Sequence, residues 1–372
     1  MSPEKLQNAL AVTDLSDPNN GIHAINLVVS EIERVLGNKA GWPTPEIIRR
    51  SPISTTENEF DRLYFPADNP SRSSTYTRYV DQNRILRTHT SSAIPDIIAE
   101  RSRLDLQDYL VLVPGICFRR DVVDREHTGE PHQMDIWRIK KGEPRLERPE
   151  LVNLIETIVE GLFPDTEYRA NEVKHPYTIN GLEVEIKMDY GWLELLECGE
   201  VHPRLLKDSG LDPDQYSGLA MGMGLDRLVM VVKEIDDIRL LRSQDPRIQE
   251  QMQNLNPYTS VSKFPPIKQD MSISVYNHVK EEDICERIRD TLGSEVDVLE
   301  EVKILSETPY ETLPPKAVER LGILPGQKNL LVRIMLRSHD RTLLQEEANE
   351  LRDTIYQAID QSKTGGYLNI TT

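Results

Sequence analysis

Apolar and polar positions alternate in different ways along this chain, and the changes mark out its elements. Between Ile22 and Leu36, apolar residues recur every three or four positions, which is the period of an amphipathic helix. Strand-like runs and alternations dominate from Tyr109, and beyond Asp270 strand and helix patterns follow one another at short intervals. The pattern therefore predicts an α+β protein with a helical N-terminal segment, a sheet-based core and a smaller C-terminal unit.

The core is predicted to be an antiparallel sheet covered by helices. Its strands are expected at 109–118, 132–139, 183–188 and 192–198, with a helix at 150–162 and a strand-to-helix unit at 218–239. The turn Asp189-Tyr190-Gly191 between the third and fourth strands is typical of a β-hairpin. Prolines and polar clusters between residues 46 and 83 predict irregular structure with short strands.

The C-terminal unit shows the order βαββαβ of a split ferredoxin-like fold. Strands are expected at 270–276, 296–302, 330–336 and 367–370, and helices at 281–292 and 348–359. The polar stretch before this unit predicts a linker. We accordingly divide the chain into a helical segment at 1–45, a core at 46–245, a linker at 246–265 and a ferredoxin-like domain at 266–372.

Composition excludes several classes of protein. A formal net charge of -18 argues against non-specific nucleic-acid binding through overall charge, although a local basic patch can still bind RNA. No window approaches the roughly 18 uncharged apolar residues of a membrane span, and the N-terminus has no targeting pattern. We expect a cytoplasmic protein with no membrane association. Its cysteines, Cys117, Cys198 and Cys285, have no paired or metal-binding spacing and are expected to be reduced.

The stretch from Gly218 to Arg239 is the strongest candidate for a nucleotide site. Gly222 and Gly224 remove side chains where a strand would have to approach a ligand closely. Arg227 follows at the junction of strand and helix, where its planar, permanently charged fork suits phosphate. The alternative is a buried strand and helix in which the glycines serve packing and Arg227 pairs with Asp226. The spacing of these residues alone does not decide between a nucleotide site and a packed strand and helix.

Other polar residues occur where apolar ones are expected. Alternation places Gln133 and Asp135 on one face of their strand, where a ligand amine could pair with them if they are not simply solvated. His89 and Ser91 precede a helix, so they serve either a ligand or the helix cap. Glu194 is a carboxylate on an otherwise apolar strand and is a candidate for holding a metal-bound phosphate.

Six short motifs, in order along the chain, resemble the phenylalanyl-tRNA synthetases, a class II family, in their single-chain organelle-type form. The motifs are PADNPSR, RTHTS, FRRD, HQMDIW, WLELLECG and GLAMGMGLDRL. The tail from SKFPPIKQDMSI to LRSHDRTLLQEEANEL is similar to that family's anticodon-binding domain. The resemblance implies a class II aminoacyl-tRNA synthetase core on an antiparallel sheet, followed by a ferredoxin-like anticodon-binding-type domain, in a monomer or a homodimer.

The resemblance also implies a reaction: ATP-dependent activation of an amino acid to an aminoacyl adenylate, followed by transfer to tRNA. Arg119 would hold the α-phosphate, with Asp121 and His127 on the adenine side. Arg227 would hold the γ-phosphate, with the bare strand at Gly222 and Gly224 beside it, and Glu194 would hold Mg²⁺. The amino-acid head group would lie among His89, Ser91, Gln133 and Asp135.

The side chain of the amino acid would be lined by His175, Tyr177, Ala220 and Met221. Here the sequence departs from the family, because His175-Pro176-Tyr177 replaces Phe-Pro-Phe and Glu197 stands where the family has glycine. The substrate is thus expected to be phenylalanine or a related, more polar amino acid. Alternatively, His175 and Tyr177 bond to protein groups and the substrate is an ordinary aromatic one.

Two other functions fit the same residues. A synthetase paralogue could pass its aminoacyl group to a carrier protein or a small molecule instead of tRNA. A non-catalytic regulatory or RNA-binding protein could use the same scaffold, although the presence of Arg119, Glu194 and Arg227 argues against it.

Overall fold

A computed structural model describes residues 1–189, 191–261, 264–338 and 341–362 of the chain. Contacts divide it into two compact units, each made of separate stretches of chain. Unit 1 comprises Met1–Arg119, Glu130–Ile235 and Gln251–Tyr258; unit 2 comprises Arg120–Gly129, Asp236–Glu250 and Thr259–Thr372. The boundaries of these units differ from those predicted from the sequence. The predicted boundaries at residues 45, 245 and 265 therefore stay predictions.

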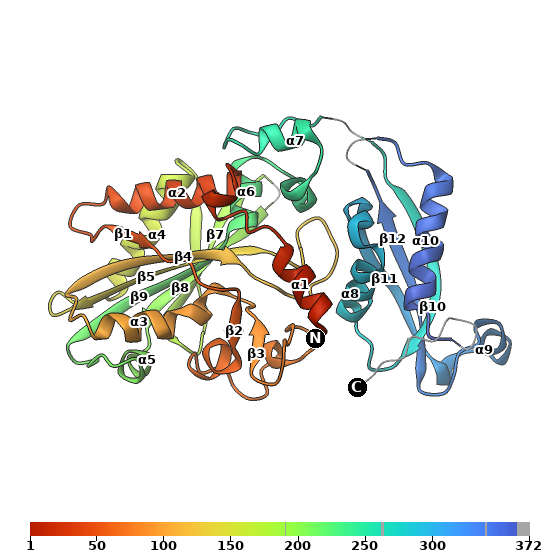
Figure 1. The fold of residues 1–372 in the computed structure, drawn as a ribbon, viewed down its shortest axis with the longest axis horizontal. Coiled ribbons are helices and arrows are strands. Elements are labelled where there is room, and N and C mark those ends of the chain that lie inside the picture. The colour runs from red at the N-terminus through yellow and green to blue at the C-terminus, as the bar shows by residue number, and fades with distance from the viewer. Residues whose placement is uncertain (190, 262–263, 339–340, 363–372) are drawn as a thin grey trace. The chain divides into compact units, whose positions relative to one another are not determined.

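A seven-stranded sheet organises unit 1, with the strand order β1-β4-β5-β9-β8-β7-β6 (Figure 1). Neighbouring strands are antiparallel except for β1 and β4, which are parallel. In spatial order the strands are β1 (Pro45–Ile47), β4 (Asp108–Ile116), β5 (His132–Lys141), β9 (Tyr216–Gly224), β8 (Gly191–Val201), β7 (Thr178–Met188) and β6 (Tyr168–Glu172). The predicted antiparallel-sheet core is confirmed.

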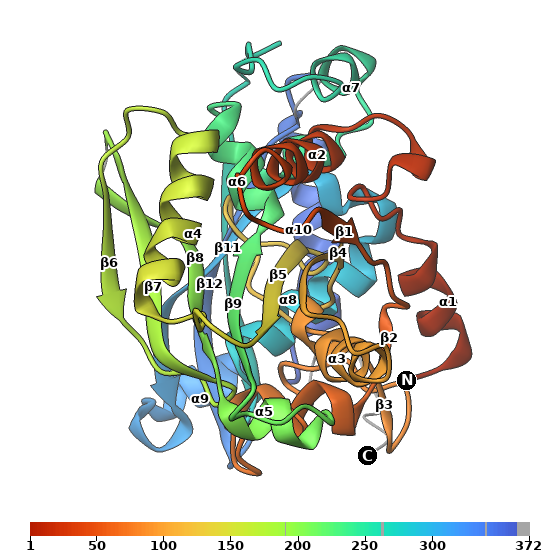
Figure 2. The same cartoon turned by 90° about the vertical axis from the view of Figure 1, so that its left-hand side faces the viewer.

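Helices cover both faces of this sheet because its central strands are apolar on both sides. Figure 2 shows α2, α4 and α6 along one face, with α3 and α5 toward the other. The bounds are α1 (Pro3–Ala11), α2 (Ala24–Gly37), α3 (Ile94–Ser102), α4 (Arg148–Leu162), α5 (Pro203–Asp208) and α6 (Leu225–Val232). A Cβ on Gly161 of α4 would come within 2.6 Å of Val35 of α2, so this glycine lets the two helices approach.

Sequence pattern located the strongly periodic elements well and the weakly periodic ones poorly. The predicted helix between Ile22 and Leu36 corresponds to α2, and β4 and β5 lie where their apolar runs indicated. Strand β6 was not predicted, because four of its five residues are exposed and it has no apolar face. The hairpin of β7 and β8 is present, with Met188 paired to Gly191; Tyr190 of its turn lies outside the described residues.

Between α2 and α3, short elements bring separate parts of the chain together. Strands β2 (Ile53–Thr55) and β3 (Arg84–Leu86) form a two-stranded sheet, and a single π-helical turn spans Glu57–Asp61. Arg87, just after β3, is 2% exposed and donates from Nε to the Ile116 carbonyl at 2.9 Å. A Cβ on Gly115 would collide with this guanidinium at 1.9 Å, so glycine is required there.

Unit 2 is a ferredoxin-like sheet with helices on it, as predicted. Its antiparallel strands have the order β10-β12-β11, and the bounds are β10 (Ile267–Tyr276), α8 (Glu281–Leu292), β11 (Leu299–Pro309), α9 (Pro315–Leu321), β12 (Gln327–Leu336) and α10 (Gln345–Ile359). Val123, from the loop between β4 and β5, is part of this core. The predicted closing strand at 367–370 lies outside the described residues.

The stretch predicted as a linker includes the short helix α7 (Pro246–Gln251), in which Ile248 is fully buried. In the described part of the chain, no helix has both the length and the apolar character needed to cross a membrane.

Candidate active site

The strand β9 presents two different faces, because successive side chains of a strand point to opposite sides. Ala220 shares one face with Gly222 and Gly224, and it packs with Trp137 in the cluster that includes α3 and α5 residues. Met221 points to the other face, opposite Ile136 and Cys198 on the neighbouring strands. Ala220 and Met221, predicted together as lining the amino-acid site, therefore lie on opposite sides of the sheet.

Space lies open above Gly222 and Gly224. A Cβ built on either glycine would meet no atom within 4 Å. Gly222 is paired with Asp135 on β5 and with Glu197 on β8, and Gly224 is paired with Gln133. Paired residues share a face, so the bare backbone of β9 is bordered by a carboxylate on each neighbouring strand. The packing alternative for these two glycines is not supported, because no neighbour occupies the missing side chain.

Asp135 is a buried carboxylate held by neutral donors. It is 4% exposed; the Thr90 hydroxyl donates to Oδ1 at 2.7 Å, and the Trp137 indole N–H donates to Oδ2 at 2.9 Å. None of the side chains in the described residues forms an ion pair with it. A buried charge needs a partner of opposite charge. Asp135 is thus suited to an ammonium group arriving with a ligand.

His89 and Ser91 flank Thr90, which donates to this carboxylate, where the chain enters the turn before α3. The His89 ring stacks on Phe65 with centroids 5.6 Å apart, and both of its ring nitrogens are buried without a hydrogen-bond partner among the described residues. Ser91 is 4% exposed and opposes the rise that burial causes in the pKa of the Tyr177 phenol. Neither side chain caps the turn, because no side-chain cap bond forms there.

One ring nitrogen of His175 has a partner within the protein, and the Tyr177 ring packs against other rings. His175 Nε2 lies 2.9 Å from Glu197 Oε2. The His175 hydrogen bond, with a further contribution from Arg119, holds the pKa of Glu197 below its ordinary value against the opposing effect of burial. Burial raises the pKa of the Tyr177 phenol, and Asp135 raises it further. For His175, the structure fits the second of the two interpretations of this element, in which the residue bonds to a protein group.

The two arginines predicted to bind phosphate come from different elements. Arg119 follows β4 and donates from Nε to the Thr88 carbonyl at 2.9 Å, which ties it to the segment that carries His89. Arg227 lies in the first turn of α6, with Nη1 3.6 Å from Glu194 Oε2. The adjacent Asp226 instead faces the ring of His132, at 3.1 Å from Nδ1.

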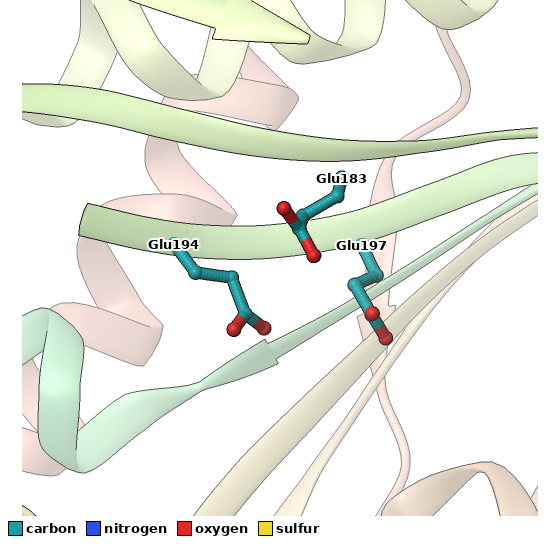
Figure 3. Close-up of side chains that lie close together, drawn as sticks. All are labelled: Glu183, Glu194 and Glu197. Atoms are coloured by element: carbon teal, nitrogen blue, oxygen red, sulfur yellow. The ribbon is translucent and has the colours of Figure 1, made fainter. Parts of the chain in front are cut away.

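Three carboxylates converge, as Figure 3 shows: Glu183 from β7, and Glu194 and Glu197 from β8. Arg227 pairs with one of them, Glu194. One oxygen from each lies within 4.8 Å of the others. Burial raises the pKa of Glu194; Arg227 opposes this rise, and the two neighbouring glutamates add to it. Three carboxylate oxygens are ligands that Mg²⁺ prefers, so this cluster fits a magnesium ion.

Pattern analysis found Glu194 and missed Glu183 and Glu197 as potential ligands. The signal was available in the hairpin, because the register pairs Glu183 directly with Glu197. Like charges placed opposite each other destabilise a sheet unless something compensates them.

The last two predicted nucleotide-binding residues, Asp121 and His127, belong to unit 2. Asp121 accepts from its neighbour Val122 N–H at 3.0 Å, and His127 Nδ1 lies 2.8 Å from Asp124. Their positions around a nucleotide stay a prediction.

Comparison with known proteins agrees with this geometry. The family described as tRNA synthetases class II core domain (F) matches residues 10–252, and the ferredoxin-fold anticodon binding domain matches residues 262–365. The chloroplastic/mitochondrial phenylalanine–tRNA ligase of Arabidopsis thaliana is 32% identical over 327 residues, which cover 84% of this chain and 70% of that protein. The phenylalanine–tRNA ligase alpha subunit of Thermosynechococcus vestitus is 32% identical over 256 residues, covering 68% and 74%.

The chain therefore belongs to the class II tRNA synthetases, and it joins their catalytic core to a ferredoxin-fold anticodon-binding domain. Within that class its core is of the F type, and the relatives named above are phenylalanine–tRNA ligases.

Proposed function

We propose that this chain uses ATP to convert phenylalanine or a related amino acid into an aminoacyl adenylate and then transfers the aminoacyl group to tRNA. The observation that carries the proposal is Asp135, a buried carboxylate without a cation, next to the open backbone of Gly222. Membership of the class II synthetases supports the same reaction. The C-terminal match to an anticodon-binding domain supports tRNA as the acceptor.

The residues take the following roles in the proposal. Asp135 pairs with the ammonium group of the amino acid, while Gln133, His89 and Ser91 fix the rest of its head group. The amino-acid carboxylate attacks the α-phosphorus of ATP, pyrophosphate leaves, and Arg119 neutralises the charge that develops on the α-phosphate. Arg227 holds the γ-phosphate, and Asp121 and His127 act on the adenine side. Most of the rate enhancement comes from positioning and charge neutralisation, with no covalent enzyme intermediate.

The glutamate cluster would hold the metal ion in this proposal. Glu183, Glu194 and Glu197 supply oxygen ligands, and a bound Mg²⁺ supplies positive charge against the phosphates of ATP. Arg227, which lies 3.6 Å from Glu194, would then contact both this metal ligand and the γ-phosphate. A cytoplasmic location and a monomeric or homodimeric state complete the proposal.

The test is ATP–pyrophosphate exchange by the purified full-length chain with each amino acid, followed by charging of total tRNA with the amino acid that responds. We expect exchange with at least one aromatic amino acid, labelled tRNA, and loss of exchange in Arg227→Ala. Labelled adenylate without labelled tRNA would instead favour a non-tRNA acceptor. Absence of exchange with every amino acid would contradict the proposal and favour a non-catalytic protein.

A further inference from the structure

A fully buried carboxylate with an unused oxygen lies next to the proposed head-group site. Glu59, in the turn Glu57–Asp61, is 0% exposed. Its Oε1 accepts two hydrogen bonds of 2.6 Å, from the backbone N–H and the hydroxyl of Thr88. Its Oε2 is buried and accepts none from the described residues. Burying a charged oxygen without a donor is costly, so a donor from outside the chain would complete this site.

The unused polar atoms cluster at this point. His89 Nε2 lies 3.5 Å from Glu59 Oε1, and both ring nitrogens of His89 also lack hydrogen bonds. Buried polar groups in folded proteins are normally paired, so two adjacent side chains with three unpaired atoms indicate a place where a ligand belongs. The head group of the amino acid can use His89, which leaves the oxygen of Glu59 without a role in the proposed function.

Glu59 and Asp135 both accept hydrogen bonds from the stretch Thr88 to Thr90. The Thr88 hydroxyl bonds to Glu59 and the Thr90 hydroxyl bonds to Asp135. His89 between them has extended backbone, with φ -151° and ψ 158°, so the two threonines project to the same side about 7 Å apart. The two buried carboxylates therefore contact positions two residues apart on the same short stretch of chain.

Glu59 and Asp135 both influence the pKa of the Cys117 thiol. Burial raises the pKa of this thiol to about 12; Arg87 and Arg119 oppose the rise, and Glu59 and Asp135 both add to it. Both carboxylates thus lie within electrostatic range of this buried thiol, as do Arg87 and Arg119.

The surroundings of His89 are aromatic. Phe65 stacks on His89 and lies 6.2 Å from the Tyr177 ring, and Tyr177 stacks on Trp137 at 6.1 Å. Aromatic faces suit a planar side chain. The contact of His175 Nε2 with Glu197 already gives that imidazole a partner within the protein, so His175 does not require a polar substrate. Glu59 does.

We propose that the amino acid activated by this chain is aromatic and carries an O–H or N–H donor on its ring, and that Glu59 accepts a hydrogen bond from that donor beside His89. This inference rests on the proposed function, and it names the substrate class and Glu59 as a specificity-determining residue. A site that has to hydrogen-bond its substrate discriminates strongly against the analogue that lacks the donor.

The first test compares ring-substituted substrates on the unaltered full-length protein. ATP–pyrophosphate exchange is measured with phenylalanine, tyrosine, 3-hydroxyphenylalanine, 4-aminophenylalanine and histidine, and with 4-fluorophenylalanine as a substituted ring that has no donor. At least one donor-bearing amino acid is expected to exceed phenylalanine and 4-fluorophenylalanine in kcat/KM by a factor on the order of 100 or more.

The second test uses Glu59→Gln, which keeps an oxygen for Thr88 and turns the unused position into a donor. It is expected to reduce kcat/KM for the preferred amino acid at least about tenfold and to narrow the preference over phenylalanine, while the KM for ATP stays unchanged. The matched control is Glu57→Gln, an exposed residue of the same turn, which should leave all of these values unaltered.

Phenylalanine used as well as every donor-bearing amino acid would overturn this inference and leave the proposed function standing. A preference that survives Glu59→Gln would overturn it too. If that variant does not fold, the comparison on the unaltered protein decides alone. No exchange with any amino acid would overturn the proposed function and this inference together.

Discussion

The imidazole of His175 and the carboxylate of Glu197 lie 2.9 Å apart, which joins the loop before β7 to the strand that borders Gly222. Both side chains are only partly buried, at 17% and 40% exposure. The pair accounts for two sequence positions that depart from the family at the same time, because each provides the partner that the other needs.

A double-mutant cycle tests this pairing. We expect His175→Phe and Glu197→Gly each to destabilise the protein, and the double variant to lose less than the sum of the two, with an interaction energy of about 0.5 to 3 kcal/mol in chemical denaturation. Effects that add to within about 0.5 kcal/mol would show that the two residues do not depend on each other.

The same pair gives a pH dependence of stability. The pKa of Glu197 is lower in the folded chain than its ordinary value of 4.5, so the folded chain releases this proton more readily than the unfolded chain. The contribution to stability is therefore present above pH 4.5 and is lost as the pH falls through the lowered value. Denaturation of Glu197→Gln at a series of pH values should lack this part of the acid transition.

Two glycines on one face of β9 should respond in opposite ways to substitution by alanine. A Cβ at Gly222 meets nothing within 4 Å, so Gly222→Ala should keep its thermal midpoint and lose ATP–pyrophosphate exchange. A Cβ at Gly218 would come within 2.5 Å of Ile139, so Gly218→Ala should be destabilised by about 1 to 3 kcal/mol. Full exchange activity in Gly222→Ala would place the substrate elsewhere.

Asp135→Asn tests the ammonium partner. The variant keeps the shape of the side chain but removes the charge, so kcat/KM for the amino acid should fall on the order of 100-fold or more, with little change in the KM for ATP. Asp108→Asn, which breaks an ion pair with Arg138 elsewhere on the same sheet, is the control and should retain exchange. Equal effects of the two substitutions would indicate a general structural loss.

Exchange should require a higher Mg²⁺ concentration at acidic pH. The pKa of Glu194 is raised, chiefly by burial, so protons compete with a cation for this carboxylate at a higher pH than is usual for glutamate. We expect the Mg²⁺ concentration that gives half-maximal exchange to rise as the pH falls through that raised value. In Glu194→Gln this pH dependence should be weaker; an unchanged dependence would remove Glu194 from the metal site.

Sequence pattern predicted the elements whose periodicity is strong and whose motifs are local. Helix α2, strands β4 and β5, the strand-to-helix unit around Gly222 and the ferredoxin-like order of unit 2 all follow from side-chain spacing, because the period of burial is set by the geometry of a single helix or strand. Asp135 and Gln133 were placed on one face by the same argument, and register confirms that they border β9.

Relations between separate elements were decided only by the tertiary structure. Strand pairing put Glu183 opposite Glu197 and near Glu194, and the fold of the loop before β7 brought His175 to Glu197. Glu59 gave no signal in the sequence, because an acidic residue in a polar stretch is normally solvated. The sequence by itself determined the class of fold and the chemistry available. Packing of the Glu57–Asp61 turn against Thr88 decided which carboxylate became buried, since burial depends on contacts between segments far apart in the chain.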